Sequence, residues 1–241
     1  MTGTILNSIT VLIGGTIGLF FGARLPERIK QTVLAGLGLF TMAIGIQMFL
    51  ETSNPIIVLL AILFGGILGE WWGIEAGLAR FGEFLEVRLT RSTESGPQSR
   101  FVRGMLTASL LFCVGPMTIL GSIQDGLTGD FTLLAIKSVL DMFAALAFAS
   151  TLGVGVLFSV IIVLIYQGGL SLLAAQAQSL VTDAMMAEMT AAGGVILLGL
   201  AISSLLEIKK IRAGNFLPAL IIAPLLTPPI TALLAWLGLG G

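Results

Sequence analysis

Residues Thr107–Gly153 read TASLLFCVGPMTILGSIQDGLTGDFTLLAIKSVLDMFAALAFASTLG, and they indicate the fold class more clearly than any other part of the chain. This stretch holds two apolar runs, and a membrane-spanning helix needs about 20 mostly apolar residues. The pair Gly115-Pro116 interrupts the first run, and Lys137 and Asp141 lie inside the second. A charged side chain at membrane depth costs at least ~2.5–3.5 kcal/mol. The stretch therefore predicts a membrane protein in which these charges have a partner, a water-filled cavity or a function.

The composition of the whole chain supports this class. The chain has 241 residues, of which 56% are hydrophobic and 10% are charged, whereas an ordinary soluble domain is about 25% charged. We therefore expect the lipid bilayer to be the main partner. The net charge of −1 argues against nucleic-acid binding. The chain has no histidine and one cysteine, Cys113, so we expect no cofactor, and an enzyme is the weakest class of function.

The apolar runs predict an all-α polytopic membrane protein that forms a single domain over residues 1–241. We expect about eight membrane-spanning helices, or seven if one run does not cross, with broken helices near the centre. Residues 76–102 form the one clearly aqueous stretch, predicted to be a cytoplasmic amphipathic helix followed by a linker. The expected spans are 4–21, 33–50, 56–72, 105–123, 131–152, 153–173, 192–206 and 216–239.

The basic residues predict the orientation of these spans. Lys and Arg collect in the cytoplasmic loops of membrane proteins. Eleven of the twelve basic residues fall in the first, third and seventh loops, and the remaining one is Lys137. This pattern fits eight spans with both termini outside the cytoplasm.

Internal similarity indicates an inverted repeat. TILNSITVLIGG near the start resembles VLFSVIIVLIYQGG from Val156, and both runs end in a glycine pair. Spans one to three and six to eight would then have opposite orientations, as in many transporters. The alternative is that glycine-rich apolar helices resemble one another by composition. The spacing Gly14-x-x-x-Gly18-x-x-x-Gly22 favours close helix packing, and such glycine-rich faces could also hold a homo-oligomer together.

The charged residues of the fifth span are the first candidates for a site. Lys137 and Asp141 are four residues apart and share a helix face, and Asp141 lies about ten residues, or about 15 Å, into the span. One interpretation is an ion pair that fixes the helix in the bundle. The other is that the pair faces a polar pathway, with Asp141 as the cation or proton site. Further candidates along the pathway are Asn7, Gly115, Pro116, Thr118, Ser122, Gln124, Asp125, Asp130 and Gln167.

Several of these candidates also have plain structural interpretations. Gly115-Pro116 could be an ordinary kink or a break that frees carbonyl groups as ion ligands. Asp130 could be the cap of the fifth helix. Asn7 and Gln167 could make hydrogen bonds between helices.

The motifs FCVGPMTILGSIQDGLTGD, LLAIKSVLD, ASTLGVGVLFS, IYQGG and GNFLPAL resemble the YdfK/YqgA-like bacterial inner-membrane family, a domain of unknown function. The resemblance covers nearly the whole chain and implies a protein of the bacterial plasma membrane. It implies no activity. From the residues we therefore expect a secondary transporter or channel for a small ion or solute. The alternative is a non-transporting scaffold or regulator that works through its surface helix at 76–90.

Overall fold

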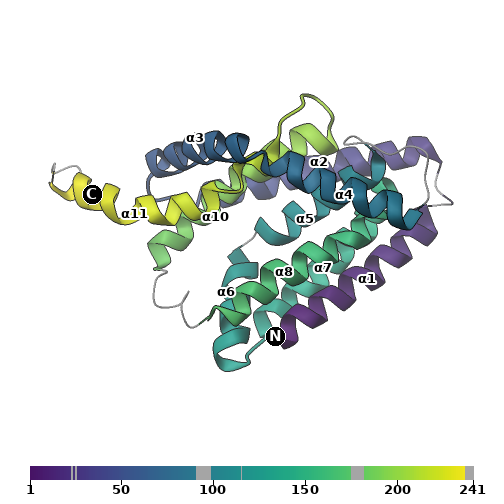
Figure 1. Ribbon diagram of the computed structural model, residues 1–241, viewed down its shortest axis with the longest axis horizontal. Coiled ribbons are helices and arrows are strands. Elements are labelled where there is room, and N and C mark those ends of the chain that lie inside the picture. The colour runs from purple at the N-terminus through teal and green to yellow at the C-terminus, as the bar shows by residue number, and fades with distance from the viewer. Residues whose placement is uncertain (23, 25, 91–98, 115, 175–181, 237–241) are drawn as a thin grey trace.

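The computed structural model describes residues 1–22, 24, 26–90, 99–114, 116–174 and 182–236, and within these ranges it consists of helices without strands (Figure 1). The predicted all-α membrane class is confirmed. The elements are α1 (Thr2–Gly22), α2 (Glu27–Phe49), α3 (Pro55–Trp72), α4 (Ile74–Thr90), α5 (Arg100–Val114), α6 (Pro116–Thr128), α7 (Thr132–Leu152), α8 (Gly155–Leu172), α10 (Asp183–Leu200), η1 (Ala201–Leu205), η2 (Ala213–Phe216) and α11 (Ala219–Trp236).

Among the described residues, seven helices are long and apolar enough to cross a membrane. The expected fourth span is instead divided into α5 and α6, whose axes differ by 64°. This bent pair is either one broken span or a re-entrant loop, so the predicted total of eight depends on it and stays a prediction. Gly115 lies outside the described residues. The Thr118 hydroxyl donates to the Phe112 carbonyl oxygen over 2.9 Å, which satisfies a backbone group at the end of α5.

Several boundaries differ from the expected ones, and the largest shift is at the start of the seventh span. The seventh span begins at Asp183 rather than near Ala192, because the Thr182 hydroxyl caps α10 by accepting from the Met185 amide. The eighth expected span contains several prolines, yet α11 continues through Pro224 and the pair that follows it. Within a membrane, neighbouring helices and local adjustments make proline tolerable inside a helix. The predicted linker lies largely at 91–98, outside the described residues.

The helices form two groups that meet along a seam (Figure 1). In one group, α1 packs on α7 and α8, while α8 packs on α5 and α6. In the other, α10 packs on α2 and α11, and α11 packs on α3. The groups meet where α2 contacts α7 and α10 contacts α5. The predicted inverted repeat stays a prediction.

The most extensive helix contact is that between α1 and α7. A Cβ atom added at Gly14 would lie 2.1 Å from the Met142 carbonyl oxygen, and one at Gly18 would lie 2.1 Å from that of Leu146. Only glycine permits backbones to approach this closely. The glycine stripe is thus covered by α7 of the same chain. The homo-oligomer expected through glycine-rich faces stays a prediction and cannot use this stripe.

Candidate functional site

The two charges of α7 form a buried ion pair. Lys137 Nζ donates to Asp141 Oδ2, and the side chains are only 6% and 11% exposed. Asn7 on α1 donates to the same oxygen from Nδ2 over 3.0 Å. The ammonium group also lies 5.8 Å from the centre of the Phe112 ring, a cation–π distance. The structure therefore shows the ion pair that was one of the two interpretations. The other interpretation, a polar pathway, requires a cavity that reaches this pair.

A cavity of about 650 Å³ does reach the pair. It lies in the seam between α2 and α7, and we call it the acidic-end cleft because Glu51 stands at one end of it. Its walls are mostly apolar, and the polar groups on them include Gln47, Lys137 and Asp141. The lining residues are Leu37, Phe40, Thr41, Ile44, Gln47, Met48, Glu51, Leu111, Met117, Lys137, Leu140, Asp141, Phe143, Ala144, Ala147, Phe148 and Leu197.

A second cavity, of about 430 Å³, lies farther along the same seam. We call it the basic-end cleft, because Lys30, Arg100 and Arg103 line it. Four apolar side chains lie between the two clefts and pack into one cluster. Leu37 and Phe148 line the acidic-end cleft, whereas Leu34 and Leu205 line the basic-end cleft. The two cavities are therefore separated by an apolar partition.

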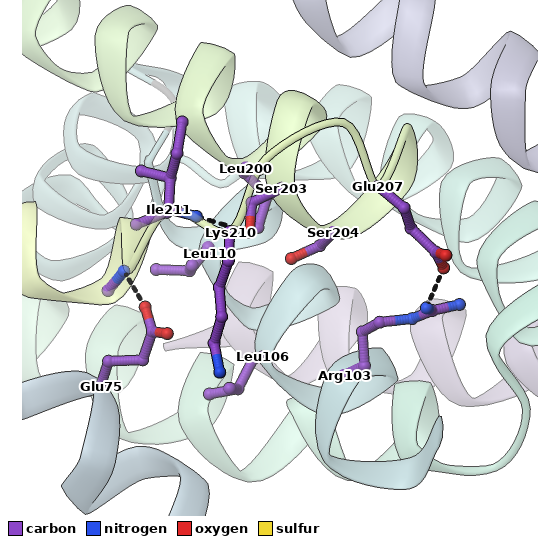
Figure 2. A pocket seen from close by; sticks show the side chains of 12 residues that line it. Glu75, Arg103, Leu106, Leu110, Leu200, Ser203, Ser204, Glu207, Lys210 and Ile211 are labelled. Carbon is purple, nitrogen blue, oxygen red and sulfur yellow. Dashed lines mark hydrogen bonds and ion pairs between the residues drawn. The ribbon is translucent and has the colours of Figure 1, made fainter. Parts of the chain in front are cut away.

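A third pocket, of about 300 Å³, adjoins the basic-end cleft and shares Arg103 and Glu207 with it. In this pocket Arg103 is paired with Glu207, as Figure 2 shows. Glu75 accepts from the Gly214 amide over 2.9 Å. Burial raises the pKa of Glu75, although this hydrogen bond opposes the change. Glu207 has a φ of 52° and follows the π-helix η1, so the backbone here is strained. The sequence did not predict this pocket, because nothing in the sequence marks a π-helix.

Six buried polar side chains on α1, α6 and α8 carry an atom that has no hydrogen-bond partner, and we call these six the polar interior. They include four predicted candidates, Asn7, Ser122, Asp125 and Gln167, each at most 3% exposed. The set is Thr4, Asn7, Ser122, Asp125, Gln167 and Ser171.

Two other candidates lie away from this interior. Gln124 and Asp130 are exposed at the turn between α6 and α7. Asp130 Oδ1 accepts from the Thr132 amide over 3.0 Å, at the first turn of α7. Hydrogen bonds from Thr132 lower the pKa of Asp130. Asp130 thus bonds to the first residue of α7, although Phe131 and not Asp130 is at the N-cap position of this helix. Pro116 begins α6.

Sequence reasoning missed the role of Glu188. This carboxylate is 1% exposed and accepts from the Thr52 hydroxyl and from the amides of Ser53 and Asn54, at 2.5, 2.9 and 3.0 Å. It therefore ties α10 to the turn before α3. The donors in Glu51-Thr52-Ser53-Asn54 were visible in the sequence, but the acceptor stands more than 130 residues away. Among the described residues, no three His, Cys, Asp or Glu side chains are grouped so that they could hold a metal ion.

Comparisons with a family model and with individual proteins place this chain in the same family. The family model described as "Protein of unknown function (DUF554)" matches residues 2–228. "Uncharacterized protein YqgA" of Escherichia coli (strain K12) is 34% identical over 95% of this chain and 97% of its own length. "Uncharacterized membrane protein YdfK" of Bacillus subtilis (strain 168) is 30% identical over 93% of this chain and 94% of its own length. No solved structure matches the chain. These matches confirm the resemblance found in the sequence.

Proposed function

We propose that this chain, which belongs to the DUF554 family, is a secondary transporter or channel for a small ion or solute in the bacterial plasma membrane, with both termini outside the cytoplasm. The observation that carries the proposal is the acidic-end cleft, whose wall includes the buried Lys137–Asp141 pair. Ionisable residues at membrane depth mark substrate or ion pathways more often than they serve packing alone. A cavity beside such a pair gives a solute a place to exchange contacts with both charges.

The partition between the two clefts favours a transporter over an open channel. A channel needs one continuous path, whereas alternating access exposes a site to one side at a time. Leu34, Leu37, Phe148 and Leu205 close the seam between the acidic-end and basic-end clefts. Rocking of the two helix groups about this partition would exchange which cleft is open.

The wall chemistry narrows the class of solute. Desolvating a bare ion against apolar side chains is costly. The acidic-end cleft offers mainly apolar contacts, and the charged groups on its wall are the ammonium of Lys137 and the carboxylates of Asp141 and Glu51. We therefore favour a small organic solute that has an apolar body and a charged or zwitterionic group.

The first test asks whether water fills the acidic-end cleft. In a Cys113→Ala background, Ala144→Cys places a thiol on the cleft wall, and Val139→Cys places one on the outer surface of the same helix, where Val139 is 50% exposed but does not line the cleft. A membrane-impermeant thiol reagent needs the ionised thiolate, so we expect reaction at position 144 to be about tenfold faster or more. Equal rates at both positions would mean that lipid fills the cleft, and this result would refute the proposed pathway.

The second test measures transport. Proteoliposomes on a solid-supported membrane are exposed to small carboxylates, amines and amino acids, and charge displacement is recorded. A solute that gives a current should lose it in Asp141→Asn but keep it in Ser138→Ala, whose hydroxyl bonds only to its own helix, at Leu134. A current that survives Asp141→Asn would contradict the assignment. Full cellular function in a strain that lacks the pair would favour the scaffold, working through α4.

A further inference from the structure

The polar interior is built with a regular spacing. Each of its three helices contributes two side chains that are one turn apart: Thr4 and Asn7 on α1, Ser122 and Asp125 on α6, and Gln167 and Ser171 on α8. Residues three or four apart share one helix face. The three helices pack against one another pairwise, and Figure 1 shows the start of α1 beside α6 and α8.

Direct contacts fix how these helices are aligned. The Gly3 amide donates to Asp125 Oδ2 over 3.0 Å, which joins the start of α1 to α6. A Cβ atom at Gly126 would lie 2.1 Å from the Ser171 carbonyl oxygen, which joins α6 to the end of α8.

These contacts define two levels in the polar interior. They bring Thr4, Asp125 and Ser171 to one level, because each is at or next to a contacting residue. One turn deeper along each helix come Asn7, Ser122 and Gln167, which therefore share a second level.

Most of the polar atoms at these levels have no partner. Both amide atoms of Gln167 are unsatisfied although the residue is 0% exposed. Asp125 Oδ1 receives no hydrogen bond but lies 3.1 Å from the Met1 amino group. Leaving buried polar atoms unpaired costs about 1–3 kcal/mol each. The oxygen atoms without any partner are Thr4 Oγ1, Asn7 Oδ1, Ser122 Oγ, Gln167 Oε1 and Ser171 Oγ, while Asp125 Oδ1 has the ion pair with Met1 alone.

We propose that the polar interior binds a monovalent alkali cation, held by hydroxyl, amide and carboxylate oxygens on α1, α6 and α8. Oxygen is the ligand that hard cations prefer, and the calcium sites of proteins combine several carboxylates. Here only one ligand, Asp125, is a carboxylate, and its charge is partly offset by the Met1 amino group. A single positive charge therefore fits this set better than a divalent ion. The site stands on its own geometry and does not require transport through the acidic-end cleft.

Asn7 would link this cation to the ion pair. Its Nδ2 donates to Asp141, while its Oδ1 is left for the cation. A cation on Oδ1 would fix the orientation of the Asn7 amide. Nδ2 would then stay in place to donate its hydrogen bond to Asp141.

The test is cation-dependent stability of the full-length protein in detergent. A ligand that binds the folded state alone raises the unfolding temperature with saturation. NaCl, KCl and choline chloride are compared at constant total salt, and binding of radioactive sodium is measured in parallel. We expect sodium or potassium to raise the unfolding temperature saturably above choline. Equal stability in all three salts would mean that water alone occupies the interior, and would overturn the proposal.

Two variants of the polar interior, Gln167→Leu and Ser122→Ala, test whether the cation binds there. Gln167→Leu keeps the approximate volume of the side chain and removes the amide, and it should lower the apparent cation affinity by about tenfold or more. The matched control is Ser159→Ala on the same helix, a residue as deeply buried whose hydroxyl already donates to Val156. A cation effect that is unchanged in Gln167→Leu and in Ser122→Ala would place the ion elsewhere and refute this site. Because no flux is measured, a negative transport result leaves this outcome unaffected.

Discussion

The Lys137–Asp141 pair shows why a single charge in a membrane protein must be judged with its neighbours. Taking two charges out of water costs several kcal/mol per ion, and their attraction offsets this only when the geometry is good. Here the carboxylate accepts from both the ammonium and Asn7. Spacing in the sequence was sufficient to predict that the two charges share a face. The contact with Asn7, 134 residues away, was not predictable, because it depends on how α1 packs against α7.

Removing one partner of this pair should destabilise the protein more than removing both. Lys137→Met or Asp141→Leu leaves an uncompensated buried charge, a loss of about 3–5 kcal/mol in the free energy of unfolding. The double variant leaves no charge, and its loss should be clearly smaller than that of either single variant. Denaturant unfolding in mixed micelles measures all four proteins. Additive losses in the double variant would contradict the ion pair.

Glu75 should make stability depend on pH in the direction opposite to a paired carboxylate. Its pKa is raised above the ordinary 4.5, chiefly by burial, so the folded protein holds this proton more tightly than the unfolded chain. Stability should therefore fall as pH rises from about 4.5 through the raised pKa. The unfolding temperature of the wild type, compared with that of Glu75→Gln, should decline across this window. A difference that rises with pH would show that the hydrogen bond from Gly214 outweighs burial.

At the scale of the helices, the contact between α1 and α7 depends on the absence of side chains. Gly14 and Gly18 let the carbonyl oxygens of Met142 and Leu146 approach to distances that a Cβ atom would block. The spacing of these glycines was visible in the sequence, and it predicted close packing. It did not say which helix would be the partner, since a second copy of the chain and α7 satisfy the same pattern.

Gly18→Ala should therefore destabilise the protein by about 1–3 kcal/mol or more, because the added methyl group meets backbone that cannot turn away. The matched control is Gly36→Ala on α2, where an added Cβ atom meets nothing within 4 Å. That change should be neutral or stabilise by up to about 1 kcal/mol, since alanine is the better helix former. The measurement is the unfolding temperature of both variants in detergent, each compared with that of the wild type. A similar loss in both would show that helix propensity, not packing, sets the effect.

Most of the helices could be predicted from apolar runs, and their irregular parts could not. The seven long apolar helices lie at or near the expected spans. The start of α10 lies at Asp183, where the Thr182 hydroxyl caps the helix, and Glu188 inside this helix bonds to the distant turn at Thr52. The bend between α5 and α6 was indicated by Gly115-Pro116, but its size depends on how the neighbouring helices pack. A sequence pattern records local preferences, whereas these features follow from tertiary contacts.

In the molecule as a whole, the two clefts differ in the charge of the residues that line them. The basic-end cleft is lined by Lys30, Arg100 and Arg103, while the acidic-end cleft opens near Glu51. Basic loops stay on the cytoplasmic side during insertion. The basic-end cleft should therefore face the cytoplasm, and the acidic-end cleft should face the outside.

This orientation can be tested in intact cells. In a Cys113→Ala background, Ser53→Cys places an exposed thiol at the acidic end, and Lys209→Cys places one at the basic end. An impermeant maleimide should label position 53 in cells whose outer envelope alone is permeable, and position 209 only after the plasma membrane is opened. The reason is that eleven of the twelve basic residues would otherwise have to be carried across the membrane. Labelling of position 209 in intact cells would show that the orientation is the opposite of the one proposed. A solute would then enter the acidic-end cleft from the cytoplasm.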